Sequence, residues 1–190
     1  MMSSAVTQLV GLSGSLRQRS FNASLLRAAV ELLPQGAKMT VESIRNIPLY
    51  DGDVEDTQGI PAPVQRLKEI IAAADGLLLV TPEYNNSIPG VFKNAIDWLS
   101  RPTADIPRVF GGKPVAMIGA SPGVFGTILS QQAWLPVLRT LGTRPWFGGR
   151  LFVPRAGSVF DEGGRIASDA TREQLRQFID GFVTFVGSKA

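Results

Sequence analysis

Five short runs of apolar residues are spaced along the chain, and stretches with a helical repeat of apolar positions lie between and after them. The runs cover residues 8–12 (with Val6 before them), 38–44, 76–81, 114–120 and 150–154. The third and fourth runs are apolar almost throughout, which is typical of strands covered on both faces within a parallel sheet. The pattern therefore predicts five parallel strands.

Between these runs, apolar residues recur at i, i+3, i+4 and i+7, the repeat of a helix with one buried face. The repeats fall within residues 25–33, 64–71, 91–99, 128–138 and 175–186. Strand and helix thus alternate five times, as in a doubly wound α/β sheet. With five strands and right-handed crossovers, the favoured strand order is 2-1-3-4-5. The Pro/Gly-rich segments 51–63 and 101–113 are expected to be surface loops.

The composition is that of a globular protein and limits the chemistry that side chains can perform. The chain has 190 residues, 44% hydrophobic and 18% charged, which suits one domain over residues 1–190. It contains no cysteine and no histidine. Disulfides, thiolate nucleophiles and Ser-His-Asp triads are therefore excluded, and no metal site is predicted. Any enzymatic chemistry is expected to rest on a bound cofactor or on carboxylates.

The charge is mildly basic and scattered. Lysine and arginine number 19 against 16 acidic residues, a net charge of +3. No basic stripe with interleaved aromatic residues appears, so nucleic-acid binding is not predicted. No apolar run approaches the roughly 20 residues that span a bilayer, and residues 1–12 lack the positive start of a signal peptide. We therefore expect a cytoplasmic protein that does not bind a membrane.

The loop after the first predicted strand is rich in hydrogen-bond donors. Ser15, Ser20 and Asn22 carry short polar side chains, and Arg17 and Arg19 add positive charge. The N-terminus of the next helix contributes free N–H groups and the positive end of its dipole. This combination suits one terminal phosphate, although the spacing matches neither Gly-x-Gly-x-x-Gly nor an NTPase P-loop. The alternative is a plain turn in which Ser20 caps the helix and the arginines face solvent.

The loop after the third predicted strand is polar and lies between two prolines. Pro82 follows the strand and Pro89 suits the first turn of the next helix. Such a loop can offer backbone donors and acceptors to the edge of a flat heterocycle, with Tyr84 over its face or rim. The alternative is an Asn-rich connecting turn.

Two further features have more ordinary interpretations. In the loop after the fourth strand, Ser121 offers a hydroxyl at the strand end, although a simple Pro-Gly turn is equally compatible with the sequence. In the helix at 91–99, Lys93 and Asp97 are four residues apart and are expected to pair on the surface. Trp98 is expected in the core or an interface rather than at a ligand.

Taken together, these motifs resemble the NADPH-dependent FMN reductase family, and within it the bacterial quinone and chromate reductases. The matching residues are Gly14-Ser15-Leu-Arg17-x-x-Ser20-x-Asn22, then Pro82-Glu83-Tyr84-Asn85-x-Ser87-x-Pro89-Gly90-x-x-Lys93-Asn94-x-x-Asp97-Trp98, then Ser121-x-Gly123. The resemblance spans about residues 8–187. It implies a flavodoxin-like three-layer sandwich that binds FMN without a covalent link.

The resemblance also implies roles for particular residues. Ser15, Arg17, Ser20 and Asn22 would hold the FMN phosphate. The isoalloxazine would be lined by Pro82, Glu83, Tyr84, Asn85 and Ser87, and Ser121 would flank its other edge. No catalytic side chain is implied, because the flavin N5 carries the chemistry, and Tyr84 is a candidate substrate contact. Members of the family are usually dimers or tetramers.

The predicted activity is electron transfer from NADPH or NADH, through bound FMN, to a small acceptor. Quinone, chromate, an azo compound and free flavin all remain open as acceptors, and the preference for NADPH is an inference from the family. One alternative is a flavodoxin-type electron carrier, against which the basic charge counts. Others are a reductase that supplies reduced flavin to a partner monooxygenase, and a nucleotide-binding regulatory module.

Overall fold

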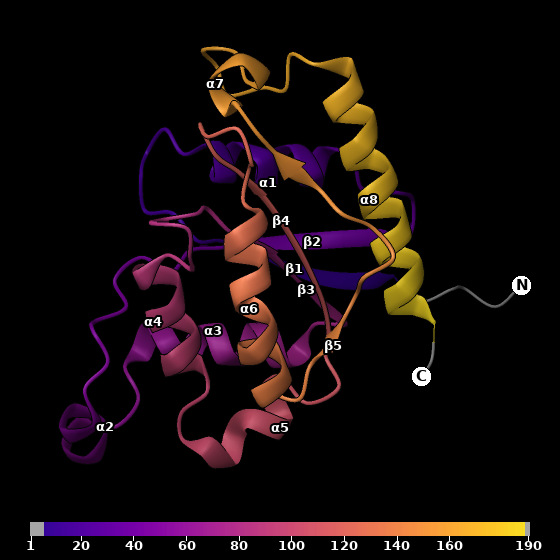
Figure 1. The fold of residues 1–190 in the computed structure, drawn as a ribbon. Helices are drawn as coiled ribbons and strands as arrows, with labels where there is room; N and C mark the ends of the chain where they lie inside the picture. The colour runs from indigo at the N-terminus through magenta and orange to yellow at the C-terminus, as the bar shows by residue number, and fades with distance from the viewer. Residues whose placement is uncertain (1–5, 189–190) are drawn as a thin grey trace, which may run out of the picture.

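The computed structural model describes residues 6–188, which form a twisted parallel sheet between two layers of helices (Figure 1). The strands are β1 (Thr7–Ser13), β2 (Ala37–Glu42), β3 (Gly76–Val80), β4 (Pro114–Ala120), β5 (Arg144–Pro145) and β6 (Phe152–Val153). The order is β2-β1-β3-β4-β5, and β6 lies off this path and pairs with the end of β4. The predicted 2-1-3-4-5 order is confirmed.

Helices cover both faces of the sheet, as the apolar strands require. On one face, α1 (Phe21–Glu31) and α8 (Asp169–Gly187) pack on the side chains of Leu9, Leu78 and Ile118. On the other, α3 (Ala62–Ala73), α4 (Gly90–Leu99) and α6 (Ile128–Thr140) pack on alternate positions of the same strands. All five residues of β3 are buried because the strand lies at the centre of the sheet. The three-layer sandwich is therefore confirmed.

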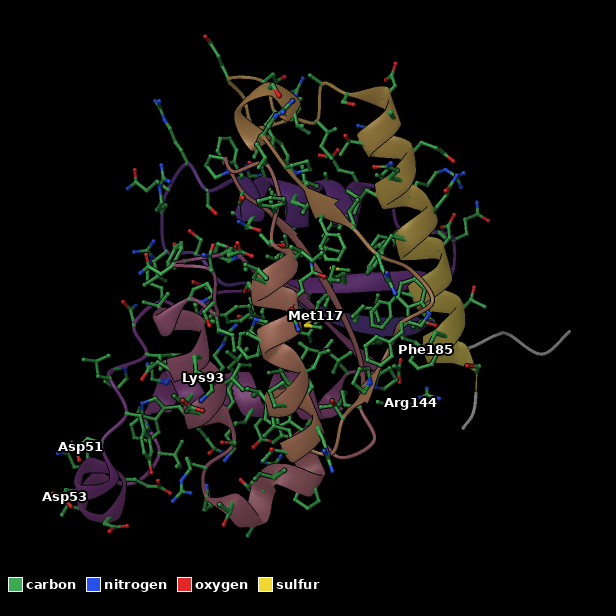
Figure 2. The ribbon with its side chains drawn as sticks, in the orientation of Figure 1. Asp51, Asp53, Lys93, Met117, Arg144 and Phe185 are labelled. Atoms are coloured by element: carbon green, nitrogen blue, oxygen red, sulfur yellow. The ribbon has the colours of Figure 1, made fainter. Side chains whose placement is uncertain are left out.

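The segment 51–63 is not a loop throughout, contrary to the sequence prediction. It contains α2 (Gly52–Gln58), and α3 begins at Ala62. The Asp51 side chain caps α2 by accepting a hydrogen bond from the Asp53 N–H, and Gly59 ends the helix with φ 76°. Helix α2 buries none of its residues, so it has no apolar repeat to detect. Figure 2 shows Asp51 at the start of this helix and Asp53 on it, well away from the sheet.

The segment 101–113 also contains short helices, η1 (Thr103–Asp105) and α5 (Ile106–Val109). The prediction of a loop was wrong here because a tertiary contact orders the chain. The fully buried side chain of Lys68 donates to the Arg101 carbonyl and to the Asp105 carboxylate. A lysine on one helix thus fixes a segment that has little helical pattern of its own.

The fifth strand is split, whereas the sequence predicted a single strand over residues 150–154. Arg144–Pro145 pairs with the start of β4 and Phe152–Val153 with its end. Between them the Trp146 ring packs edge-on against Phe178 of α8, with ring centroids 4.8 Å apart. The chain therefore leaves the sheet here and rejoins it, and the apolar run revealed only the second half. After β6, the short helix α7 (Ala156–Val159) leads to α8.

The structure also bears on the expectations for helix α4 and for membrane-spanning helices. The Lys93 Nζ is 2.7 Å from Asp97 Oδ1, and Trp98 is fully buried, as predicted (Figure 2 labels Lys93 on α4). No helix within residues 6–188 is both long enough and apolar enough to cross a bilayer. The first five residues of the segment 1–12, which we did not interpret as a signal peptide, lie outside the described residues.

Candidate cofactor-binding site

The loops after β1, β3 and β4 meet in one cleft at the carboxyl edge of the sheet. It is lined by Ser15, Arg17, Ser20, Phe21, Asn22, Pro82, Glu83, Tyr84, Ala120, Ser121 and Pro122. Eight of the ten residues predicted to contact the cofactor are in this set. The polar turn near the N-terminus and the proline-bracketed turn in mid-chain therefore converge in space, the condition on which the FMN prediction depends.

Strand register explains this convergence. Ser13 pairs with Val80, and Val80 pairs with Ile118, so the three strands end at nearly the same level. The first residue beyond each strand continues the ladder: the Gly14 N–H donates to the Val80 carbonyl at 2.9 Å, and the Thr81 N–H donates to Ile118 at 2.9 Å. The loops thus begin side by side, as expected at the switch point of a doubly wound sheet.

The first loop ends at the N-terminus of α1, where Ser20 is the N-cap. The buried Ser20 Oγ accepts a hydrogen bond from the Ala23 N–H at 3.3 Å, and the first turn carries no acidic residue. Gly14 is required at the start of the loop because a Cβ there would lie 2.2 Å from the Phe92 ring. Free backbone donors, the helix dipole and Arg17 therefore face the cleft, an arrangement suited to a phosphate.

Asn22 has a partner that the sequence did not indicate. Its side-chain Nδ2 donates to the Ala120 carbonyl at 2.8 Å, and its Oδ1 accepts from the Ala120 N–H at 2.9 Å. The amide thereby joins the start of α1 to the end of β4, 98 residues apart in the sequence. It lines the cleft, but its bonds show a role in holding the first and third loops together.

The second loop contains a tight two-residue turn. Tyr84 and Ser87 exchange both backbone hydrogen bonds, at 3.2 and 3.0 Å. Between them Asn85 and Asn86 adopt φ values of 50° and 60°. Two positive φ values define a type I′ turn, which asparagine tolerates better than most residues. Tyr84 lines the cleft with 42% of its surface exposed, whereas Asn85 and Ser87 are exposed beyond its lining.

Glu83, the acid in the cleft lining, is tied to the helix after the third loop. Its Oε2 accepts from the N–H groups of Leu129 and Ser130, both at 2.9 Å. The side chain of Thr127, the residue at the N-cap of α6, accepts no capping hydrogen bond from an N–H of that helix. Glu83 therefore caps α6 from another loop, and the helix N-terminus stabilises its negative charge.

A network of buried hydrogen bonds around the Thr81 hydroxyl fixes the start of the second loop. Thr81 Oγ1 lies 2.9 Å from both the Pro82 carbonyl and Ser130 Oγ, and it accepts from Trp134 Nε1 at 3.1 Å. Thr81 is fully buried. Sequence analysis missed this residue as part of the site, although a polar residue closing the most apolar strand was a usable signal.

Ser121 is held in place by three bonds at the start of the third loop. Its N–H donates to the Val153 carbonyl, its carbonyl accepts from the Ala156 N–H, and its Oγ accepts from the Gly123 N–H, all within 3.1 Å. Ser121 is buried and lines the cleft, as predicted. The neighbouring residues Phe21, Ala120 and Pro122 also line it and were not singled out from the sequence.

The groups present fit an FMN molecule. Ser13 Oγ, where β1 meets the first loop, is buried and has no hydrogen-bond partner in the described part of the chain. A buried hydroxyl without a partner is uncommon and indicates a group that the protein does not itself supply. With Glu83 committed to α6, Arg17 and the α1 N-terminus dominate the charge near the first loop. A dianionic phosphate is the kind of group that would match this positive charge.

Comparison with known proteins decides the family. The family model described as NADPH-dependent FMN reductase matches residues 7–158. The chain belongs to the NADPH-dependent FMN reductase family. It is therefore an oxidoreductase that uses FMN with NAD(P)H as electron donor, and the resemblance stated from its motifs is confirmed.

Individual relatives agree with this assignment over nearly the whole chain. An NAD(P)H-dependent FMN reductase of Pseudomonas aeruginosa is 41% identical over 179 residues, covering 94% of this chain and 95% of that protein. A 2-hydroxy-1,4-benzoquinone reductase of a Burkholderia species is 40% identical, covering 91% and 92%. Among solved structures, the flavoenzyme NAD(P)H:(acceptor) oxidoreductase of Paracoccus denitrificans superposes with TM-score 0.84 at 33% identity, covering 95% and 97%. The flavodoxin-like fold is confirmed.

Proposed function

We propose that this reductase binds FMN non-covalently in the cleft and passes electrons from NAD(P)H to quinones. The observation that carries the proposal is the convergence of the three loops, which brings phosphate donors and a rigid polar turn to one cleft. Quinone is favoured as acceptor because relatives from Burkholderia and Escherichia coli are named for quinone reduction. Chromate, azo compounds and free flavin are the other acceptors to test.

Some residues of the cleft would bind the cofactor, and others would orient the residues that bind it. Ser15, Ser20, Arg17 and the α1 N-terminus would bind the phosphate, whose two negative charges match a cation and a helix dipole. Asn22 would contribute by fixing that helix end against Ala120. When bound, FMN would supply the hydride and electron transfer between NAD(P)H and the acceptor, so the side chains need not carry that chemistry.

The second loop would line the ring. Its type I′ turn fixes Tyr84 at the exposed rim, where the phenol would contact a flat acceptor or the nicotinamide. The side of this loop that faces the isoalloxazine would be formed by Pro82, Glu83, Asn85 and Ser87. Ser121 would flank the opposite edge of the ring. Because the turn is hydrogen-bonded to itself and Glu83 is bonded to α6, the loop is preorganised before any ligand binds.

Oligomerisation is part of the proposal. Ile128, Leu129 and Leu135 of α6 are exposed apolar residues, and Phe125 before it and Phe147 in the split of the fifth strand are 73% and 67% exposed. Ile128, Leu135 and Phe147 line one open hollow, and exposed apolar side chains gathered in one region are typical of protein interfaces. We expect a homodimer or homotetramer of single-domain subunits, acting in the cytoplasm where NAD(P)H is maintained.

The first test is an absorbance spectrum of the purified protein, with and without added FMN, followed by NADPH and NADH oxidation with a panel of quinones. Flavin bands and steady-state quinone reduction are expected. Bound flavin without turnover would indicate an electron carrier, and loss of reduced FMN on gel filtration would indicate supply to a monooxygenase. A protein that takes up no FMN would overturn the proposal in favour of a regulatory module.

Two variants test the site itself. Arg17→Ala should lose FMN on dialysis while unfolding like the wild type, because an exposed arginine rarely contributes to folding. Tyr84→Ala should keep FMN but change the KM for quinone or NAD(P)H. Full flavin retention in Arg17→Ala would refute the phosphate assignment, and unchanged kinetics in Tyr84→Ala would leave that ring as packing alone.

A further inference from the structure

Among the residues that the structure describes, the loop that carries Ser15 and Arg17 has one hydrogen bond to another element, and a residue outside the family motif provides it. Arg45 Nη2 donates to the Leu16 carbonyl at 2.6 Å, across 29 residues of sequence. Within the described part of the chain, residues 15–19 make one other hydrogen bond, the local Arg17 N–H to Ser15 Oγ at 3.3 Å. Apart from Arg45, no residue between 6 and 188 hydrogen-bonds this segment to another element.

Arg45 is itself well anchored. The preceding residue, Ile44, is 3% exposed and belongs to the core beneath α3 and α4. The Arg45 N–H donates to Ser43 Oγ at 3.1 Å, and Asn46 follows with φ 65°, so the chain turns tightly on both sides. The guanidinium therefore reaches the loop from a fixed backbone rather than from a flexible strand end.

We propose that Arg45 is a positioning residue that holds the phosphate loop in its FMN-binding shape and adds a third positive charge beside Arg17 and Arg19. This inference rests on the proposed FMN site. A guanidinium can donate to the Leu16 carbonyl and still present its charge to a nearby anion, since it carries five N–H donors in a planar fork. Without this bond, the loop would have to be ordered at the moment of binding, which weakens affinity.

The experiment compares FMN with riboflavin, which has the same ring and ribityl chain but no phosphate. Dissociation constants are measured by flavin fluorescence quenching on apo-protein for the wild type, Arg45→Met and Arg45→Lys. Arg139→Met is the matched control, because it removes the same charge from the far end of α6, at the opposite edge of the sheet. Amide hydrogen exchange of Arg17, whose N–H is hydrogen-bonded to Ser15 Oγ within this segment, reports the order of the segment in the apo-protein independently of any ligand.

Arg45→Met is expected to weaken FMN binding about five-fold, the effect of losing one exposed charge-assisted hydrogen bond, and to leave riboflavin binding unchanged. Exchange at the Arg17 amide should rise. Arg45→Lys should recover part of the FMN affinity through its charge, and more so at low salt. Arg139→Met should match the wild type for both flavins.

The outcomes separate this inference from the proposed function. If the wild type binds FMN and Arg45→Met binds it equally well, the positioning role is refuted and the site survives. Equal weakening of FMN and riboflavin would also refute it, because that result indicates general damage to the fold. A wild type that binds no FMN overturns the proposed function and this inference together.

Discussion

The side-chain amide of Asn22 pairs with both backbone groups of Ala120, at 2.8 and 2.9 Å, and so fastens the start of α1 to the end of β4. Replacement by alanine leaves a buried N–H and C=O without partners. We expect Asn22→Ala to lower the free energy of unfolding by about 2 kcal/mol, measured by urea denaturation. FMN retention should fall as well, because the first and third loops lose their connection.

Gln18→Ala is the control for this change. Gln18 carries the same amide on the exposed first loop, and its side chain makes no hydrogen bond within the described residues. Its replacement should alter unfolding by less than about 0.5 kcal/mol. Equal effects of the two substitutions would mean that the pairing with Ala120 contributes nothing particular to stability.

Glu83 couples the second loop to α6 through two bonds to backbone N–H groups. Glu83→Ala should destabilise the protein by about 1 kcal/mol, the usual effect of losing a helix cap, and should speed amide exchange at Leu129 and Ser130. Glu83→Gln keeps an acceptor oxygen without the charge, so its stability should lie between those of the wild type and Glu83→Ala. Unchanged exchange at these two amides in Glu83→Ala would contradict the capping role.

The type I′ turn makes a prediction that depends on backbone shape alone. Asn86 has φ 60°, where a Cβ-bearing side chain other than asparagine or aspartate is strained and glycine is not. Asn86→Gly should therefore be at least as stable as the wild type, whereas Asn86→Ala should be less stable than Asn86→Gly by about 1 kcal/mol. Chemical denaturation of the two variants measures this difference, and its absence would mean that the turn relaxes to another type.

Acid should weaken the attachment of α2. Arg101 donates to Glu55 at 2.7 Å and holds the pKa of that carboxyl below its ordinary 4.5, and the Tyr50 hydroxyl also donates to it. A lowered pKa means that Glu55 stabilises the folded state fully above its unfolded-state pKa and loses this effect as pH falls through the folded-state value. Tyr50, which donates to the same carboxylate, has its pKa raised.

Thermal unfolding of Glu55→Gln checks the direction of this pH dependence. The variant should melt below the wild type at pH 7, and the gap should close as the pH falls below the ordinary carboxyl value of 4.5 and through the lowered folded-state pKa of Glu55. Glu31→Gln, at an exposed carboxylate without an ion pair in residues 6–188, should show no such closing. A gap that persists at low pH would mean that Glu55 acts through packing rather than through its charge.

Much of the fold followed from the local pattern because β3 and β4 are apolar at nearly every position and helices cover both faces. Strand order followed from the alternation of elements together with the handedness of crossovers. The prediction was wrong at α2, α5 and the split fifth strand. Helix α2 buries none of its residues, and the split depends on Trp146 packing against α8, a contact between distant parts of the chain.

The sequence by itself determined which residues could bind a phosphate and a flat ring, because donor type and loop position can be read from the sequence once the strands are placed. Only the tertiary structure decided how those residues are used. Asn22 is bound to Ala120, Glu83 to α6, and the Leu16 carbonyl of the first loop to Arg45, through bonds that span 98, 46 and 29 residues. The physical reason is that hydrogen-bond partners far apart in sequence are fixed by strand register and layer packing, which no local pattern encodes.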